Sequence, residues 1–218
     1  MRLRPRWWRE LFFLAALLFS LAALLPLHWA VDRLGFADRG LKARHAEGSV
    51  WAGALEDARL GPVRLGDVGT RLRVLPLLAG WARLDLAQQG NGLSAGLTAT
   101  RHGFGIDDAS GTIEVPGFDA VPAATLELDD LSVRFADGLC SAAEGMVRLR
   151  LSGPLGDAPP APGVSGQARC DGPALLLPLA SQSGADRLDL RLYADGRYRI
   201  DAALRGATPY SGRFEGSF

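Results

Sequence analysis

The longest uninterrupted apolar stretch of the chain runs from Leu11 to Val31 and contains no charged residue. A helix of about 20 apolar residues matches the ~30 Å hydrocarbon core of a bilayer. A single span in lipid must satisfy its own backbone hydrogen bonds, and a helix does so. The pattern therefore predicts a transmembrane helix over residues 11–31.

The charges before this stretch indicate its orientation. Arg2, Arg4, Arg6 and Arg9 precede it, and basic residues favour the cytoplasmic side of a span. The rest of the chain is then expected on the far side of the membrane. A cleaved secretory signal peptide is the alternative, since it too has a basic region followed by an apolar one. The length of the stretch and the bulky Leu27–Trp29 segment favour an uncleaved anchor.

Beyond Gly48, apolar and polar residues alternate with period two in short runs between glycine-marked turns. This alternation is typical of half-buried strands. The preceding segment, Asp32–Glu47, has apolar positions too loosely spaced for an amphipathic helix, so we expect a short helix or an extended linker there. The expected strands cover 54–60, 63–74, 82–86, 93–99, 111–115, 124–128, 131–135, 146–151, 188–193 and 198–202, with an edge strand near the C-terminus.

Four connections between these strands have turn or loop signatures. Leu75–Gly80 is apolar, with an early proline and a final glycine, and predicts a single helical turn. Asn91–Gly92 and Asp195–Gly196 predict tight hairpins, and Pro154–Gly163 predicts a loop. The fold class that follows is mainly β: one N-terminal transmembrane helix and an antiparallel, meander-like β domain with few short helices.

An apolar segment followed by a hairpin occurs twice in the sequence. Leu75–Leu78 precedes a strand at 84–86, and Leu177–Ala180 precedes a strand at 188–190. Duplication would make the domain two similar β-units side by side. Convergent strand composition accounts for the echo equally well, and both explanations remain open at this point.

Composition limits the classes of partner and fold. The chain has 218 residues, with 24 Lys and Arg against 24 Asp and Glu, so its formal net charge is zero. Outside the N-terminal arginines no basic patch favours nucleic acid. The 27 glycines and 13 prolines are too many for a helix bundle and too dispersed for a disordered tail. The residues beyond the apolar stretch suffice for one domain of ordinary size.

The two cysteines, Cys140 and Cys170, both follow the predicted anchor. In an oxidising compartment, two cysteines most simply form one disulfide. We therefore predict a Cys140–Cys170 bridge.

Motifs for catalysis, nucleotide binding and metal binding are missing from the sequence. The histidines His28, His45 and His102 are isolated from any partner at ligand spacing. We find no nucleophile elbow, zincin motif or P-loop. The sequence thus predicts no enzymatic activity, no catalytic residues, no cofactor and no metal site.

One acidic cluster has the carboxylates that a calcium site uses. Glu127, Asp129 and Asp130 lie in one segment, and Asp107 and Asp108 lie in an earlier expected turn. The glycine-punctuated ligand spacing of a calcium loop is missing. We expect solvated turn carboxylates instead.

Four parts of the sequence carry a family resemblance: Gly48–Leu55, Leu75–Gly80, Cys140 with Gly145, and Cys170 with Gly172. They resemble the protein N family of the bacterial type II secretion system. The basic N-terminus, the single anchor and the length of the β domain resemble that family too. The resemblance implies an inner-membrane, bitopic accessory protein whose partners are other secretion components and the lipid bilayer, with no enzymatic role and no cofactor.

The resulting organisation places the N-terminus in the cytoplasm and the C-terminal domain in the periplasm. It comprises a basic tail (1–10), the transmembrane helix (11–31), a linker (32–47) and a periplasmic β domain (48–218). Trp51, between two glycines, is expected to pack on the next strand or to serve as a contact for a partner. Two functions remain: docking of other secretion components, or an apolar β-groove that binds or shuttles lipid.

Overall fold

The computed structural model describes residues 10–14, 16–17, 20, 41–60, 63–88, 92–116, 123–152, 163–205 and 210–217. Residues 10–14, 16–17 and 20 are helical. Most of the predicted 11–31 span lies outside the described residues. Within the described part of the chain, no helix has both the length and the apolar character needed to cross a bilayer.

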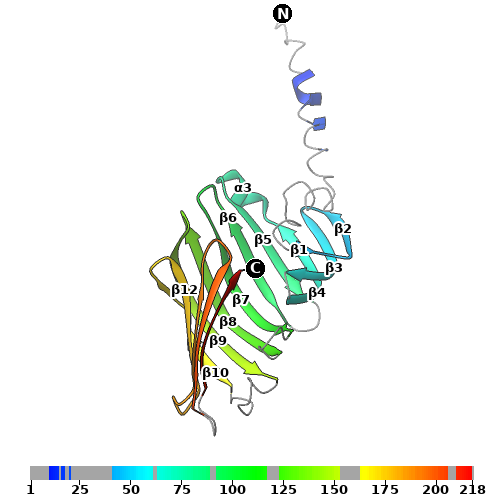
Figure 1. Cartoon of the computed structure of the whole chain (residues 1–218). Helices are drawn as coiled ribbons and strands as arrows, with labels where there is room; N and C mark the ends of the chain where they lie inside the picture. Colours follow the sequence, from blue (N-terminus) through cyan, green and yellow to red (C-terminus); the bar gives the residue numbers. More distant parts are fainter. Residues whose placement is uncertain are drawn as a thin grey trace, which may run out of the picture.

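All described strands belong to one antiparallel 15-stranded sheet (Figure 1). Neighbours in the sheet are mostly neighbours in sequence, in the order β1-β3-β4-β5-β6-β7-β8-β9-β10-β12-β13-β14-β15, while β2 pairs with β3 and β11 with β12. The predicted antiparallel meander is thus confirmed. The strands are β1 (Leu41–Lys42), β2 (His45–Ser49), β3 (Ala52–Leu60), β4 (Val63–Leu72), β5 (Ala82–Gln88), β6 (Ser94–Ala99), β7 (Gly103–Val115), β8 (Ala124–Ala136), β9 (Leu139–Leu151), β10 (Val164–Gln167), β11 (Arg169–Asp171), β12 (Ala174–Ala180), β13 (Arg187–Leu192), β14 (Arg197–Leu204) and β15 (Tyr210–Ser217).

One side of this sheet is apolar along nearly its whole width. Residues paired across antiparallel strands project to the same side, and the register pairs apolar residues with one another repeatedly. Leu128 pairs with Val147, Leu177 with Leu190, and Leu190 with Ile200. We call this side the inner face. The opposite side, the outer face, carries charged residues such as Glu127, Arg148, Arg191, Asp201 and Arg213.

The sheet curls around its inner face. In Figure 1 the C-terminal strands, orange to dark red, cross in front of β7–β9. Val147 of β9 is 0 % exposed and Leu179 of β12 is 2 % exposed, although the described fold is a single sheet. Such complete burial requires other strands of the same sheet to cover the inner face. The main apolar cluster accordingly joins residues of β7–β10 to leucines of β12.

Among the described strands, β3, β7 and β8 each contain a β-bulge at an aspartate. Asp57, Asp108 and Asp130 have positive φ angles of 49°, 54° and 54°, and the strand register shifts beside each of them. A bulge inserts one residue and bends the strand. The backbone N–H of Asp108 donates to Ser132 Oγ, 3.0 Å away. Because of the extra residue, Leu128 and Leu131 both pack into the main cluster although they are three positions apart.

Several predicted elements are confirmed. The segment expected as a helical turn, Leu75–Gly80, overlaps the short helix α3 (Val74–Leu78). The Asp195–Gly196 turn joins β13 to β14, and the Tyr193 N–H donates to the Arg197 carbonyl oxygen at 2.9 Å. β15 is the edge strand expected near the C-terminus. Pro154–Gly163 lies, apart from Gly163, outside the described residues, as does Asn91 of the other predicted hairpin.

The expected turn at Asp107 and Asp108 is wrong. Both residues lie inside β7, which runs continuously from Gly103 to Val115, and the two strands expected at 124–128 and 131–135 are the single strand β8. The bulges at Asp108 and Asp130 explain the error, because one inserted residue breaks the period-two pattern without ending the strand.

The internal echo is not a structural repeat. Leu75–Leu78 belongs to α3, whereas Leu177–Ala180 lies in strand β12. Leu175, Leu176 and Leu177 are all buried, so β12 lacks the alternation that would have marked it as a strand.

The structure also shows that the sheet begins inside the segment expected to be a linker, Asp32–Glu47, where β1 and β2 pair with β3.

Candidate functional site

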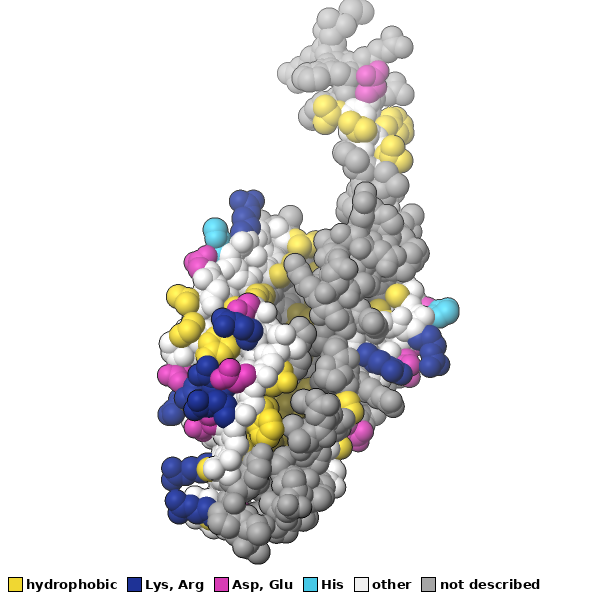
Figure 2. Space-filling model, viewed as in Figure 1, with side chains coloured by type: hydrophobic (Ala, Val, Ile, Leu, Met, Phe, Trp, Pro, Cys, Tyr) yellow, Lys and Arg dark blue, Asp and Glu magenta, His cyan; other side chains and the backbone are white. Residues whose placement is uncertain are grey.

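Part of the inner face is left uncovered. Leu97 of β6 and Ile106 and Phe104 of β7 are 36 %, 38 % and 50 % exposed, and Leu97 pairs with Ile106 in the sheet. The Phe104 ring stacks on that of Phe135, with centroids 5.3 Å apart. We call Leu97, Phe104 and Ile106 the apolar strip. Figure 2 shows hydrophobic side chains, in yellow, gathered along a hollow in this view of the molecule.

The neighbouring part of the inner face is closed and braced by a disulfide. Ile106 pairs with Val133, which is already 5 % exposed, so exposure falls sharply from β7 to β8. The structure contains the predicted bridge: Cys140 of β9 and Cys170 of β11 are disulfide-bonded, with 5.5 Å between their Cα atoms. Cys140 is part of the main cluster and Cys170 packs against it. The closed part is therefore a packed core, whereas the apolar strip beside it is exposed.

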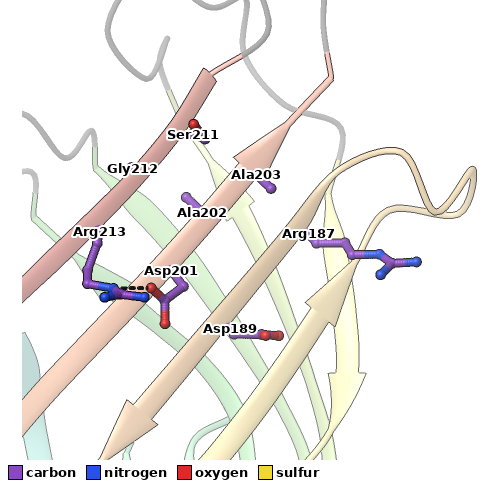
Figure 3. Close-up of a pocket in the computed structure, with 8 residues that line it drawn as sticks. All are labelled: Arg187, Asp189, Asp201, Ala202, Ala203, Ser211, Gly212 and Arg213. Atoms are coloured by element: carbon purple, nitrogen blue, oxygen red, sulfur yellow. Dashed lines mark hydrogen bonds and ion pairs between the residues drawn. The ribbon is translucent and has the colours of Figure 1, made fainter.

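The outer face carries a ladder of ion pairs over β13–β15. Arg191 lies 3.1 Å from Asp171 and 3.3 Å from Asp201, and Arg213 lies 2.6 Å from Asp201. Figure 3 shows Arg213 of β15 pointing toward Asp201 of β14 beside a shallow depression of about 430 Å³. The depression is lined by Arg187, Asp189, Asp201, Ala202, Ala203, Ser211, Gly212 and Arg213.

The electrostatics of this depression favour a structural role. The hydrogen bond from Arg213 and the charges of Arg213, Arg191 and Arg199 lower the pKa of Asp201, against a smaller opposing effect of burial. Asp201 is thus held as a carboxylate that already accepts from two arginines. A general acid or base needs a pKa near the working pH. The arrangement is suited to bracing the sheet.

A second ionic cluster surrounds the buried carboxylate of Asp107, beside the bulge of β7. Asp107 is 4 % exposed, and its carboxylate accepts two hydrogen bonds from Arg134, at 3.0 and 3.2 Å, and one from the Thr98 hydroxyl. Arg83 lies 3.8 Å away. Burial by itself raises the pKa of Asp107, but these hydrogen bonds and charges outweigh it, and the pKa lies below its usual value. The expectation of a solvated turn carboxylate is therefore wrong for Asp107.

The short helix α3 projects apolar side chains into solvent. Val74, Leu75 and Leu77 are 54 %, 79 % and 38 % exposed. The helix has five residues, too few to bury three large side chains against the sheet. Its base is held by Arg73, whose Nε lies 2.6 Å from an Asp85 carboxylate oxygen. We call Val74, Leu75 and Leu77 the α3 knob; exposed apolar groups placed together are typical of contact surfaces.

Trp51 lies in the turn between β2 and β3 and is half-buried. The turn is tight: Gly48 has a φ of +87°, and a Cβ there would lie 2.7 Å from the Ala52 carbonyl oxygen. Trp51 makes further interactions within the chain, which fits the packing role, while its role as a partner contact stays a prediction. Trp51 does not lie near either cysteine. It lies beside β2 and β3, close to one end of the strand order, whereas the cysteines are in β9 and β11.

Sequence reasoning did not identify the α3 knob as a surface, although its signal was present: three large apolar residues in one helical turn. Nor could it pair Asp107 with Arg134, which are 27 residues apart.

His45 and His102 are exposed, and His102 Nδ1 lies 3.6 Å from an Asp137 oxygen. Among the described residues, no three His, Cys, Asp or Glu side chains are grouped so as to hold a metal ion.

Comparison with known proteins gives one family. Residues 39–212 match the family model of the type II secretion system (T2SS), protein N. Neither the curated proteins nor the solved structures contain a significant match. The matched range spans β1–β14 and the first residues of β15, and it covers well over half of the 218 residues. The chain therefore belongs to the protein N family of the type II secretion system.

Proposed function

We propose that this protein is a non-enzymatic inner-membrane component of the type II secretion system, whose β domain lies in the periplasm and docks other secretion components. The family match supports a role in the system. Four arginines before an uncharged apolar stretch support the anchor and its orientation. The Cys140–Cys170 disulfide fits an oxidising compartment.

The α3 knob is the observation that carries docking. Leu75 is 79 % exposed, with Val74 and Leu77 exposed beside it. Fully burying a leucine side chain is worth about 1.5–3 kcal/mol, and a partner that covers this knob gains that energy without any rearrangement of the sheet. The Arg73–Asp85 ion pair holds the helix in place before the partner arrives.

Site-specific photocrosslinking in intact cells tests this proposal. A photoreactive amino acid at Leu75 is expected to capture another secretion component, and Leu75→Asp is expected to reduce secretion several-fold at unchanged protein level. Leu139, 55 % exposed beside the β8–β9 turn, is the matched control position. A phosphatase reporter active only in the periplasm, fused after Phe218, reports the topology in the same cells. An inactive fusion, or equal capture at both positions, contradicts the proposal.

The apolar strip favours a second candidate function, a β-groove that binds or shuttles lipid. Leu97, Phe104 and Ile106 are exposed on the concave side of a curled sheet, where an acyl chain finds apolar contacts. Their exposure contrasts with the packed core beside them, so ligand can reach the strip without unfolding the domain.

Lipid content of the purified full-length protein separates this candidate from docking alone. If the strip holds an acyl chain, Phe104→Asp should keep its circular dichroism spectrum and lose most of the co-purified lipid. Leu139 is an exposed apolar residue on the outer face, so Leu139→Asp should retain as much lipid as the wild-type protein. Wild-type protein that carries no lipid above the detergent background, or equal lipid in both variants, removes the groove from consideration.

A further inference from the structure

The last strand of the sheet has one edge without a partner in the described chain. β15 pairs with β14 over eight residue pairs, from Arg197 with Ser217 to Leu204 with Tyr210, and it ends the strand order. Figure 1 shows it in dark red. An edge strand presents a row of backbone N–H and C=O groups that another strand can pair with.

The sequence of β15 is self-complementary when it is reversed. Ser211-Gly212-Arg213-Phe214-Glu215-Gly216-Ser217 has serines at both ends, glycines next to them, opposite charges inside and a phenylalanine at the centre. If two copies pair antiparallel about Phe214, Arg213 faces Glu215 of the partner subunit and Glu215 faces Arg213 of the partner subunit. Opposite charges directly across a strand pair are favourable, and like charges are unfavourable.

The two faces of the strand support the same pairing. Arg213 and Glu215 are exposed on the outer face. There Arg213 forms an ion pair with Asp201 at 2.6 Å, and Glu215 forms one with Arg199 at 2.7 Å. Phe214 is half-buried on the inner face, across from Ile200. The pairing therefore continues the outer ion-pair ladder into the second copy. It also brings two phenylalanine rings together on the inner face.

The charges also exclude neighbouring registers. Moving the centre of symmetry from Phe214 to Arg213 places arginine opposite arginine, and moving it to Glu215 places glutamate opposite glutamate. If the centre of symmetry lies between two consecutive residues, an outer side chain of one copy faces an inner side chain of the other, because side chains alternate between the two faces of a strand. Among these neighbouring registers, the one centred on Phe214 places opposite charges across the pair and keeps each side chain on its own face.

We propose that two copies of this chain associate through β15, antiparallel and centred on Phe214, so that the two sheets become one. An interface about a twofold axis must be self-complementary, and β15 meets this requirement by sequence and by the placement of its side chains. The assembly joins the two apolar inner faces edge to edge.

Disulfide crosslinking of the full-length protein in its membrane tests the register. The chain's two cysteines, Cys140 and Cys170, are bonded to each other, so Phe214→Cys introduces the single free thiol. Residues directly opposite in an antiparallel pair have Cα atoms about 4.5–5.5 Å apart, within the range that a disulfide bridges. Mild oxidation is expected to convert most of this variant to a covalent dimer.

Off-centre cysteines provide the control. In this register Ser211 faces Ser217 of the other copy, and the two Ser211 residues are six residues, or about 20 Å, apart along the strand pair. Ser211→Cys should therefore not crosslink to itself. A mixture of differently tagged Ser211→Cys and Ser217→Cys chains should give mixed dimers. No dimer from Phe214→Cys, capture of a different protein there, or equal self-crosslinking of Ser211→Cys overturns the proposal.

Charge reversal tests the physical cause in the Phe214→Cys background. Arg213→Glu or Glu215→Arg alone should lower the dimer yield about tenfold, because both cross-strand pairs become like-charged. Mixing the two variants restores opposite charges in the mixed dimer and should restore its yield. The exposed ion pairs lost within each chain contribute little to folding, and circular dichroism checks this. Unchanged yield in both single variants overturns the proposal.

Discussion

Replacing Leu179 by alanine is expected to lower the free energy of unfolding by about 2–5 kcal/mol. Leu179 is 2 % exposed, pairs with Leu188 of β13 and belongs to the main cluster together with Val147. The truncation leaves a cavity where β12 packs against the strands that curl over it. Urea unfolding of the full chain, followed by circular dichroism, measures the loss.

Leu75→Ala is the matched control, because it makes the same chemical change at a side chain that is 79 % exposed. It should alter the free energy of unfolding by no more than about 0.5 kcal/mol, as surface substitutions usually do. Equal losses for the two variants contradict the curled sheet, because Leu179 would then lie no deeper than Leu75.

Removing the disulfide with Cys140→Ser and Cys170→Ser is expected to cost about 3–4 kcal/mol. The bridge closes a loop with a sequence separation of 30 residues, and the chain-entropy model gives that stabilisation for such a loop. For a domain of this size the melting temperature should fall by roughly 10 °C. The fold should persist at low temperature, because the cluster around the bridge includes many residues besides the two cysteines.

Two measurements accompany this prediction. Wild-type protein melted under reducing conditions should match the double variant, since both lack the same constraint. Alkylation of the native, unreduced protein followed by mass spectrometry should label neither cysteine. Labelling of both cysteines in the native protein refutes the bridge, whatever the melting temperatures show.

Local sequence signals predicted much of the β domain. Asp195–Gly196 between two alternating runs predicted the β13–β14 hairpin, because this turn is specified by its own residues. Leu75–Gly80 predicted a short helix for the same reason. The Cys140–Cys170 bridge was predictable because a chain with two cysteines allows one pairing.

The candidate surfaces were less accessible to such reasoning. The bulges at Asp108 and Asp130 hid the continuity of β7 and β8, so Asp107 was placed in a solvated turn. Its burial depends on Thr98, Arg134 and Arg83, which come from other strands. β12 escaped detection because its burial on both sides removes the alternation that marks a half-buried strand.

By itself, the sequence determined the properties that depend on neighbours along the chain: which side of the alternating strands is apolar, where the β13–β14 hairpin turns, and the segments by which the family is recognised. It also predicts the anchor at 11–31, since hydrophobic length and flanking charge act locally. The tertiary structure alone decided which part of the apolar face is covered. Leu179 and Phe104 both lie on the inner face of the sheet, yet one is 2 % and the other 50 % exposed. The physical reason is that coverage depends on how far the sheet curls, which is set by bulges and by packing between strands distant in the chain.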